Sequence, residues 1–202
     1  MGASPRLLKM QRLWGAVEAC TSCEHLQPHV TKKVFGDGNV SADIVLVGEG
    51  PGAEEDATGH PFVGDAGELL TDILHHAGLR REELFICNAV KCRCSSVKGF
   101  TVKNRKPNQR EMANCQPYLL QQLQLVKPKV IVGLGGTAIA TLKNVKTKDV
   151  KSTQLAGLTE RGKNAWYVWT YHPSYPIYRG RDVAIIEQMV GHFQKAKEMS
   201  RA

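Results

Sequence analysis

The sequence predicts an α/β fold, a three-layer α/β/α sandwich around a central, mostly parallel four-stranded sheet. Short runs of β-branched and apolar residues alternate with longer segments of helical periodicity along the chain, a pattern typical of parallel sheets covered by helices on both faces. The 202 residues, 42% of them hydrophobic and 23% charged, suffice for one core of ordinary globular composition. We therefore expect residues 1–202 to form one domain, with no internal repeat or linker.

The first half of the chain should supply two strands and two helices. Residues 5–19 carry apolar positions at helical spacing, and a cysteine pair follows them. Residues 42–48 (ADIVLVG) and 84–90 (LFICNAV) are expected to be buried strands, because apolar and β-branched residues cluster there between turn signals. Between these strands, helical spacing predicts a helix over residues 65–77, with Gly78 just past its end.

A basic loop should follow the second strand and lead into a helix that begins near Asn108. Glu111 stands three residues after Asn108, which is the spacing of a capping box. Pro117 should kink or break this helix, since proline has no N–H to donate and its ring crowds the preceding turn.

The last third of the chain completes the predicted sheet. Residues 129–134 form the third strand and continue into a short helix that we expect to be capped by Thr137. Residues 165–171 form the fourth strand, and residues 182–199 have the spacing of a final amphipathic helix.

The charge balance favours polyanionic partners. The formal net charge is +8, and two stretches are strongly basic, Lys98–Arg110 and Arg179–Arg181. Such stretches bind phosphates in some proteins and are solvated loops in others, so charge alone does not decide between these readings. No apolar run reaches the roughly 18 residues of a membrane span, and we expect a cytoplasmic monomer without a signal peptide.

Six cysteines occur, at positions 20, 23, 87, 92, 94 and 115. In a cytoplasmic protein this usage favours a metal centre over disulfides. Cys20 and Cys23 can share one centre, and Cys92 and Cys115 would complete a set of four thiolates, with Cys94 as a rival for the third ligand. Cys87, inside a strand, is expected to be an apolar core residue. The spacing fits both an iron–sulfur cluster and zinc.

Three segments with chemically useful side chains follow predicted strands. They are the Glu49–Gly52 loop, Asn88 and His172. Because ligand sites of open α/β sheets collect beyond the carboxyl ends of the strands, we expect these segments to meet at one edge of the sheet.

Several motifs in order along the chain resemble those of the family 4, iron–sulfur-containing uracil-DNA glycosylases. They are GEGPGAEED (residues 48–56), TGHPFVG (58–64), NAVKC (88–92), NRKP (104–107), CQPY (115–118) and TYHPS (170–174). The resemblance implies the uracil-DNA glycosylase superfamily fold and a monofunctional enzyme. Such an enzyme flips uracil out of single- or double-stranded DNA and hydrolyses the glycosidic bond. The resemblance also favours a 4Fe-4S cluster over zinc as the group that the cysteines bind.

The resemblance assigns a role to three residues of the expected pocket. Phe62 would stack on the flipped base. Asn88 would accept a hydrogen bond from uracil N3–H and donate one to O4, a pattern that cytosine reverses. His172 would donate to uracil O2 as negative charge develops on the leaving base.

The same resemblance implies roles for the first loop and for the segment after the histidine. Glu49 and the backbone of Gly50 would hold the hydrolytic water, and Glu55 would help to close the pocket against a thymine methyl group. Independently of the resemblance, Gly50 and Gly52 flank Pro51, a combination that permits close approach of the backbone to a ligand or forms a tight turn. Because position 50 is glycine, strong general-base activation from that position is excluded. Contacts with DNA are expected from Ser174, Tyr175, Arg179 and Arg181.

Alternatives remain open at this point. The chain could act on other deaminated bases, could bind uracil-containing DNA without cutting it, or could be a ferredoxin-like electron carrier. The segment between Cys92 and Cys115 is longer than is usual in the family, and a related branch traps DNA covalently through a histidine there. No histidine lies between His76 and His172, so we predict turnover.

Overall fold

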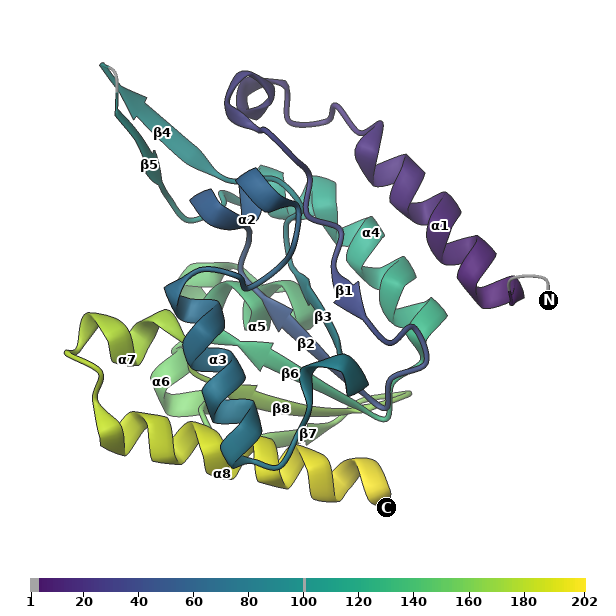
Figure 1. The fold of residues 1–202 in the computed structure, drawn as a ribbon, viewed down its shortest axis with the longest axis vertical. Coiled ribbons are helices and arrows are strands. Elements are labelled where there is room, and N and C mark those ends of the chain that lie inside the picture. Colours follow the sequence, from purple (N-terminus) through teal and green to yellow (C-terminus); the bar gives the residue numbers. More distant parts are fainter. Residues whose placement is uncertain (1–3, 100) are drawn as a thin grey trace.

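The computed structural model describes residues 4–99 and 101–202, and a six-stranded sheet forms its centre (Figure 1). The strand order is β1-β3-β2-β6-β8-β7. The four predicted strands form the parallel middle, namely β3 (Phe85–Asn88), β2 (Ile44–Gly48), β6 (Val130–Leu134) and β8 (Trp166–Thr170). The α/β sandwich prediction is therefore confirmed.

Two edge strands were not predicted, so the expected number of four is wrong for the sheet as a whole. The strands β1 (Asp37–Gly38) and β7 (Thr159–Arg161) pair antiparallel with β3 and β8. Each is only two or three residues long and partly exposed, which is too short for the alternation of apolar residues that reveals a strand in a sequence.

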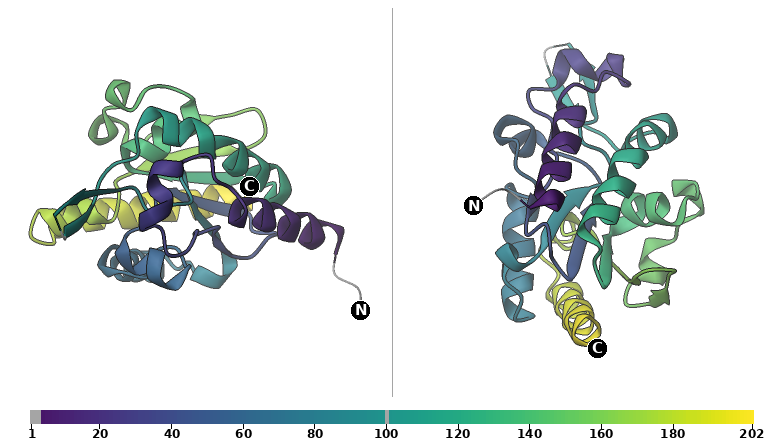
Figure 2. Two further views of the ribbon diagram at one scale, coloured as in Figure 1. Left: turned by 90° about the horizontal axis from the view of Figure 1, so that it is seen from above. Right: turned by 90° about the vertical axis from the view of Figure 1, so that its right-hand side faces the viewer.

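Helices cover both faces of the sheet (Figure 2). One face packs against α3 (Asp65–His76) and α8 (Val183–Arg201). The other packs against α1 (Pro5–Glu18), α4 (Gln109–Val126) and α5 (Gly135–Lys143). Short helical segments lie in the connections, namely η1 (Glu24–His29), α2 (Ala53–Thr58), η2 (Arg81–Glu83), η3 (Thr147–Asp149), α6 (Ser152–Leu155) and α7 (Ser174–Tyr178).

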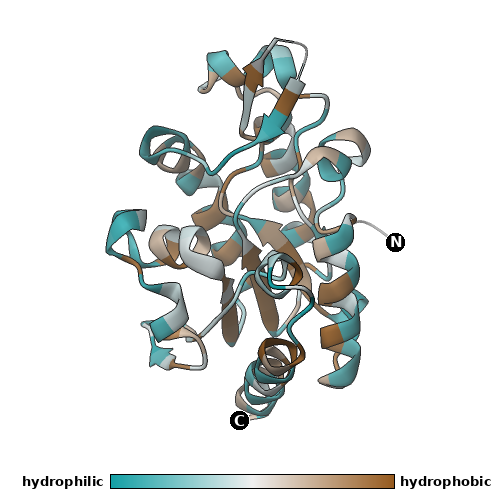
Figure 3. Ribbon diagram, turned by 90° about the vertical axis from the view of Figure 1, so that its left-hand side faces the viewer, coloured by the Kyte–Doolittle hydropathy of each residue, from teal (hydrophilic) through white to brown (hydrophobic). Residues whose placement is uncertain are grey.

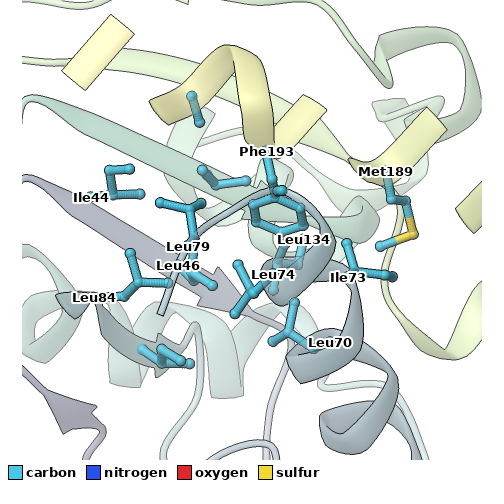
Figure 4. Close-up of a cluster of buried hydrophobic side chains, with 14 of the residues drawn as sticks. Ile44, Leu46, Leu70, Ile73, Leu74, Leu79, Leu84, Leu134, Met189 and Phe193 are labelled. Atoms are coloured by element: carbon cyan, nitrogen blue, oxygen red, sulfur yellow. The ribbon is translucent and has the colours of Figure 1, made fainter. Parts of the chain in front are cut away.

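Alternate residues of the central strands point into two hydrophobic clusters, one on each face of the sheet. In β2, Ile44 and Leu46 face α3 and α8, whereas Val45 and Val47 face the opposite layer, as the two-residue period of a strand requires. Figure 4 shows Leu46 with Leu70 and Phe193 in the first of these clusters. Hydrophobic residues are concentrated on the central strands (Figure 3). No helix in the described part of the chain is long and apolar enough to cross a membrane.

The helix α4 runs through Pro117 from Gln109 to Val126, so the predicted break is wrong. Proline removes the bond to the carbonyl four residues earlier, which belongs to Ala113. Both Ala113 and Pro117 are exposed, so water can bind that carbonyl. Buried neighbours such as Leu119 hold the helix against the sheet.

The basic stretch is not a plain loop. The strands β4 (Ser95–Lys98) and β5 (Thr101–Asn104) pair antiparallel as a hairpin that is separate from the main sheet. Phe100, which belongs to the predicted basic stretch, lies outside the described residues. Thr137 also differs from the prediction, because α5 begins at Gly135 and Thr137 lies inside the helix and does not cap it.

Candidate active site

A cavity of about 670 Å³ opens at the carboxyl ends of the parallel strands. Four segments meet there: the loop after β2 with α2, the end of β3, the turn from β6 into α5, and the segment after β8 with α7. Its walls include Glu49, Gly50, Gly52, Glu55, Phe62, Asn88, His172, Ser174 and Tyr175. The structure therefore brings together most of the residues singled out from the sequence.

Asn88 is the last residue of β3, and its side chain is buried in the cavity wall. The residue is 2% exposed, and its Oδ1 has no hydrogen-bond partner within the described chain. Gly48, its neighbour in β2, makes room for it, because a Cβ there would lie 2.3 Å from Asn88 Oδ1. A buried acceptor without a partner costs free energy, and a ligand with a donor would satisfy it.

Phe62 is held in an unfavourable backbone conformation beside Asn88. Its φ is +54°, a left-handed conformation that a phenylalanine rarely adopts. Contacts on both sides hold the loop: Arg81 donates a hydrogen bond to the carbonyl of Pro61, and the close approach of Gly67 leaves no room for a side chain there. The phenyl ring lies 5.9 Å from the His172 ring, so Phe62, Asn88 and His172 share one hollow.

The hydrogen bonds of His172 define its tautomer. The Ser174 backbone N–H donates to His172 Nδ1 at 3.2 Å, and Ser174 Oγ lies 2.8 Å from the same nitrogen. Burial lowers the pKa of His172, although Glu49 and Glu55 oppose this shift. A neutral ring that accepts at Nδ1 carries its proton on Nε2, so His172 offers a donor there.

Glu49 and Glu55 have different surroundings. Glu49 lies in the cavity wall and accepts a hydrogen bond of 2.5 Å from the Thr137 hydroxyl. Both oxygens of Glu55 bind backbone amides, Oε2 that of Gly52 and Oε1 those of Val63 and Gly64. Glu55 therefore ties the start of α2 to the loop that carries Phe62.

The segment after His172 forms one side of the cavity mouth. Tyr175 stacks on Tyr171 with ring centroids 5.2 Å apart, and Arg179 lies over Tyr175. Tyr178 is 86% exposed and also lines the cavity. Arg179 and Arg181 are exposed and lie outside the cavity lining.

Sequence reasoning missed residues on the opposite side of the mouth. Asn104, Arg105, Lys106 and Pro107, at the base of the β4–β5 hairpin, line the cavity. The NRKP motif that contains them was noticed, but a sequence alone does not show that this loop folds back over the site. Thr137 was taken for a helix cap, and only the tertiary contact with Glu49 reveals its position in the site.

The cysteines gather beside this cavity. Cys20, Cys23, Cys92, Cys94 and Cys115 line a second, much smaller cavity of about 20 Å³. Cys87 is buried in the core among apolar side chains, as its position in a strand predicted. Burial raises the pKa of the Cys92 thiol to about 12, so a thiolate here needs a positive partner. No three His, Cys, Asp or Glu side chains of the described residues are arranged around a point that would hold a single metal ion.

Lys91 links the cysteine cluster to Asn88. Its ammonium group, in a side chain 1% exposed, donates to the Asn88 carbonyl at 2.8 Å and to Gln122 Oε1 at 2.6 Å. Its backbone N–H donates to Cys115 Sγ at 3.4 Å. Lys91 therefore connects the end of β3 to the cysteine cluster.

The fold and site define an α/β protein with a cavity at the carboxyl ends of its parallel strands, next to a cluster of thiols. Residues 35–195 match the model of the uracil DNA glycosylase superfamily. The type-4 uracil-DNA glycosylase of Thermotoga maritima is 42% identical over 184 residues, which cover 90% of this chain and 89% of the relative. That of Archaeoglobus fulgidus is 37% identical over 94% of both chains. The chain belongs to the type-4 uracil-DNA glycosylases of this superfamily.

Proposed function

We propose that this chain excises uracil from DNA as a monofunctional glycosylase and leaves an abasic site. The observation that carries this proposal is the buried Oδ1 of Asn88, which has no hydrogen-bond partner among residues 4–99 and 101–202, in a cavity that Phe62 and His172 share. The family to which the chain belongs supports the same activity. The substrate would be uracil-containing DNA, single- or double-stranded, and the enzyme a cytoplasmic monomer.

Base recognition would rest on Asn88 and Phe62. The Asn88 amide offers an acceptor for uracil N3–H and a donor for O4, whereas cytosine presents an acceptor at N3 and a donor at N4. The Phe62 ring would supply the stacking surface for the extruded base, a contact worth about 1–3 kcal/mol. The strained φ of Phe62 and the contacts that hold it favour a pocket that is formed before the base enters.

Bond cleavage would rest on His172 and Glu49. As the bond between N1 and C1′ breaks, its electron pair moves onto the base, and the Nε2–H of a neutral His172 would stabilise the charge on O2. A water oxygen then bonds to C1′, and the proton that this water loses passes through solvent to the uracil anion, which leaves as neutral uracil. Glu49, oriented by Thr137, would hold this water with the Gly50 backbone and stabilise positive charge on the sugar.

Glu55 would position the loop that forms one wall of the pocket and would not contact the base itself. Because its oxygens are occupied by backbone amides of Gly52, Val63 and Gly64, it would keep the Phe62 loop closed over the base, and this would exclude a thymine methyl group. Ser174 and Tyr175, with Arg179 and Arg181, would contact the DNA backbone.

The cysteines would hold a 4Fe-4S cluster through Cys20, Cys23, Cys92 and Cys115. The thiols surround one cavity, and four cysteine thiolates are the ligand set of such a cluster. Four thiolates would also bind zinc, and membership of the type-4 family favours the cluster. Its contribution would be to join the N-terminal segment to the end of β3 and to α4. Cys94 lines the same cavity and remains the alternative third ligand.

A single assay tests the proposal. Purified protein is incubated with an oligonucleotide that contains uracil, abasic sites are cut by alkali, and the visible absorbance of the same sample is recorded. We expect many turnovers per enzyme and an iron–sulfur spectrum. Tight binding without release would instead indicate a binding protein, and release of hypoxanthine or mismatched thymine would indicate a broader specificity.

A further inference from the structure

The β4–β5 hairpin projects from the body of the protein without a partner element. It makes its main contacts within itself, and it extends away from the helices and the central sheet (Figures 1 and 2). Gly99 has a φ of +60°, as tight hairpin turns require. An element that adds so little to the core suggests a role on the surface.

The charged side chains in and around the hairpin are all basic. Residues 91–110 include seven lysines and arginines and no aspartate or glutamate. Three of these basic side chains have partners inside the protein: Lys91 in its buried network, Arg93 in a hydrogen bond to Asn104 Oδ1, and Arg105 in an ion pair with Glu111. Lys103 and Lys106 are exposed, and neither forms an ion pair with a carboxylate of the described residues.

The two faces of the hairpin differ in chemistry. Directly opposed residues share a face, and the register pairs Ser96 with Lys103 and Val97 with Val102. One face therefore carries hydroxyl and ammonium donors. On the other, Val97 and Val102 are 47% and 38% exposed, and the same face continues to Asn104 in the cavity wall.

The hairpin and α7 lie on the same side of the molecule (Figures 1 and 2). Lys106 lines the cavity from the hairpin side, and Tyr175 and Tyr178 line it from the α7 side. A nucleotide that entered the cavity would bring its flanking phosphates close to the residues that line it from these two elements.

We propose that the β4–β5 hairpin, with Lys103 and Lys106, binds the DNA backbone beside the flipped nucleotide. This inference rests on the proposed function, which supplies the DNA. The Val97–Val102 face, which continues to Asn104 in the cavity wall, packs against sugars and base edges. The long side chains of Lys103 and Lys106 extend to phosphates of the same strand. The substrate strand thus lies between the hairpin and α7.

The salt dependence of DNA binding tests the proposal. The variant Lys103→Gln/Lys106→Gln is compared with wild type on a labelled single-stranded oligonucleotide without uracil, by fluorescence anisotropy at several salt concentrations. Each lost phosphate contact should reduce the slope of log Kd against log salt by about 0.7. We expect a reduction of about 1.4 for the double variant, and a slope equal to that of wild type would overturn the proposal.

Lys9→Gln/Arg12→Gln provides the matched control. Lys9 and Arg12 are exposed on α1, which lies on the far side of the molecule from the hairpin (Figure 1), and the double change removes the same two charges. It should leave the slope unchanged. An equal loss in this control would show that net charge alone sets the binding, and this also would overturn the proposal.

Removal of the hairpin gives an independent test. Ser95 and Asn104 are already cross-strand partners, so residues 96–103 can be replaced by Asn-Gly, which forms a tight two-residue turn. We expect weaker DNA binding with an unchanged melting temperature. Unchanged binding by a folded variant would contradict the proposal.

Uracil release by the wild-type protein separates this inference from the proposed function. If wild type releases no uracil, the proposed function fails. If wild type releases uracil while DNA binding is insensitive to both hairpin variants, only the present inference fails.

Discussion

Asn88 owes its position in the pocket to neighbours that are not catalytic. Gly48 leaves room for its side chain, and Lys91 holds its carbonyl. The conformation that presents the amide to a ligand is therefore built into the end of β3 before any ligand arrives. Preorganisation of this kind reduces the free energy that a substrate would otherwise spend on ordering the site.

Asn88→Ala should lower the rate of uracil release by at least about 10²-fold, because it removes both hydrogen bonds to the base edge. Single-turnover kinetics on a uracil oligonucleotide measure the effect. Asn164→Ala, at an exposed loop position, is the control and should behave as wild type. A near-normal rate for Asn88→Ala, with folding intact, would remove Asn88 from its assigned role.

The protonation of His172 predicts the pH profile. Burial lowers its pKa below the usual value of about 6.5, so the ring is neutral at neutral pH. If the neutral ring is the active form, the single-turnover rate should be constant from about pH 8 to about pH 6.5 and should fall only at lower pH. A rate that rises as the pH falls through this range would show that the charged imidazolium is required.

At the scale of elements, Glu111 joins three segments that are distant in sequence. Its carboxylate binds Arg105 at the base of the hairpin, His25 in η1 and the Asn108 backbone N–H at the start of α4. Burial alone would raise the pKa of Glu111, but hydrogen bonds from Arg105, His25 and Asn108 outweigh it and lower the pKa to about 2. The predicted capping box is thus one part of a larger junction.

Glu111→Gln should reduce the free energy of unfolding by about 2 kcal/mol, the usual scale for hydrogen bonds to a charged group. The pKa of this carboxyl group is about 4.5 in the unfolded chain. In wild type, its contribution to the free energy of unfolding should therefore be complete above about pH 4.5 and should be lost as the pH falls toward 2. Urea unfolding at several pH values measures both effects. Glu198→Gln, at an exposed position in α8, should change neither, and an equal effect in both variants would contradict this role for the junction.

At the scale of the whole molecule, the cysteine cluster lies where parts of the chain meet that the sheet does not join. It lies between η1, the segment after β3 and α4. A metal centre there would stabilise the native state through ligands contributed from across nearly 100 residues of sequence. The loss of the cluster should therefore affect stability as well as colour.

Cys115→Ser should abolish the visible absorbance of the purified protein and lower its melting temperature, because one of four ligands is lost. Cys87→Ala should keep the absorbance, since Cys87 lies in the apolar core. Cys94→Ser should also keep it if Cys92 is the third ligand. Absorbance that is lost in Cys94→Ser and kept in Cys92→Ser would reverse that assignment.

The sequence by itself determined the α/β class, the four parallel strands and the types of residue at the site. These features are local: apolar periodicity marks each strand and helix, and the motifs carry their own residue types. Only the tertiary structure decided that Glu55 ties down a loop, that Thr137 orients Glu49, that α4 continues through Pro117 and that a basic hairpin borders the cavity. Each of these features depends on contacts between segments distant in sequence or on exposure to solvent. The residue pattern of a single segment encodes neither long-range contacts nor solvent exposure.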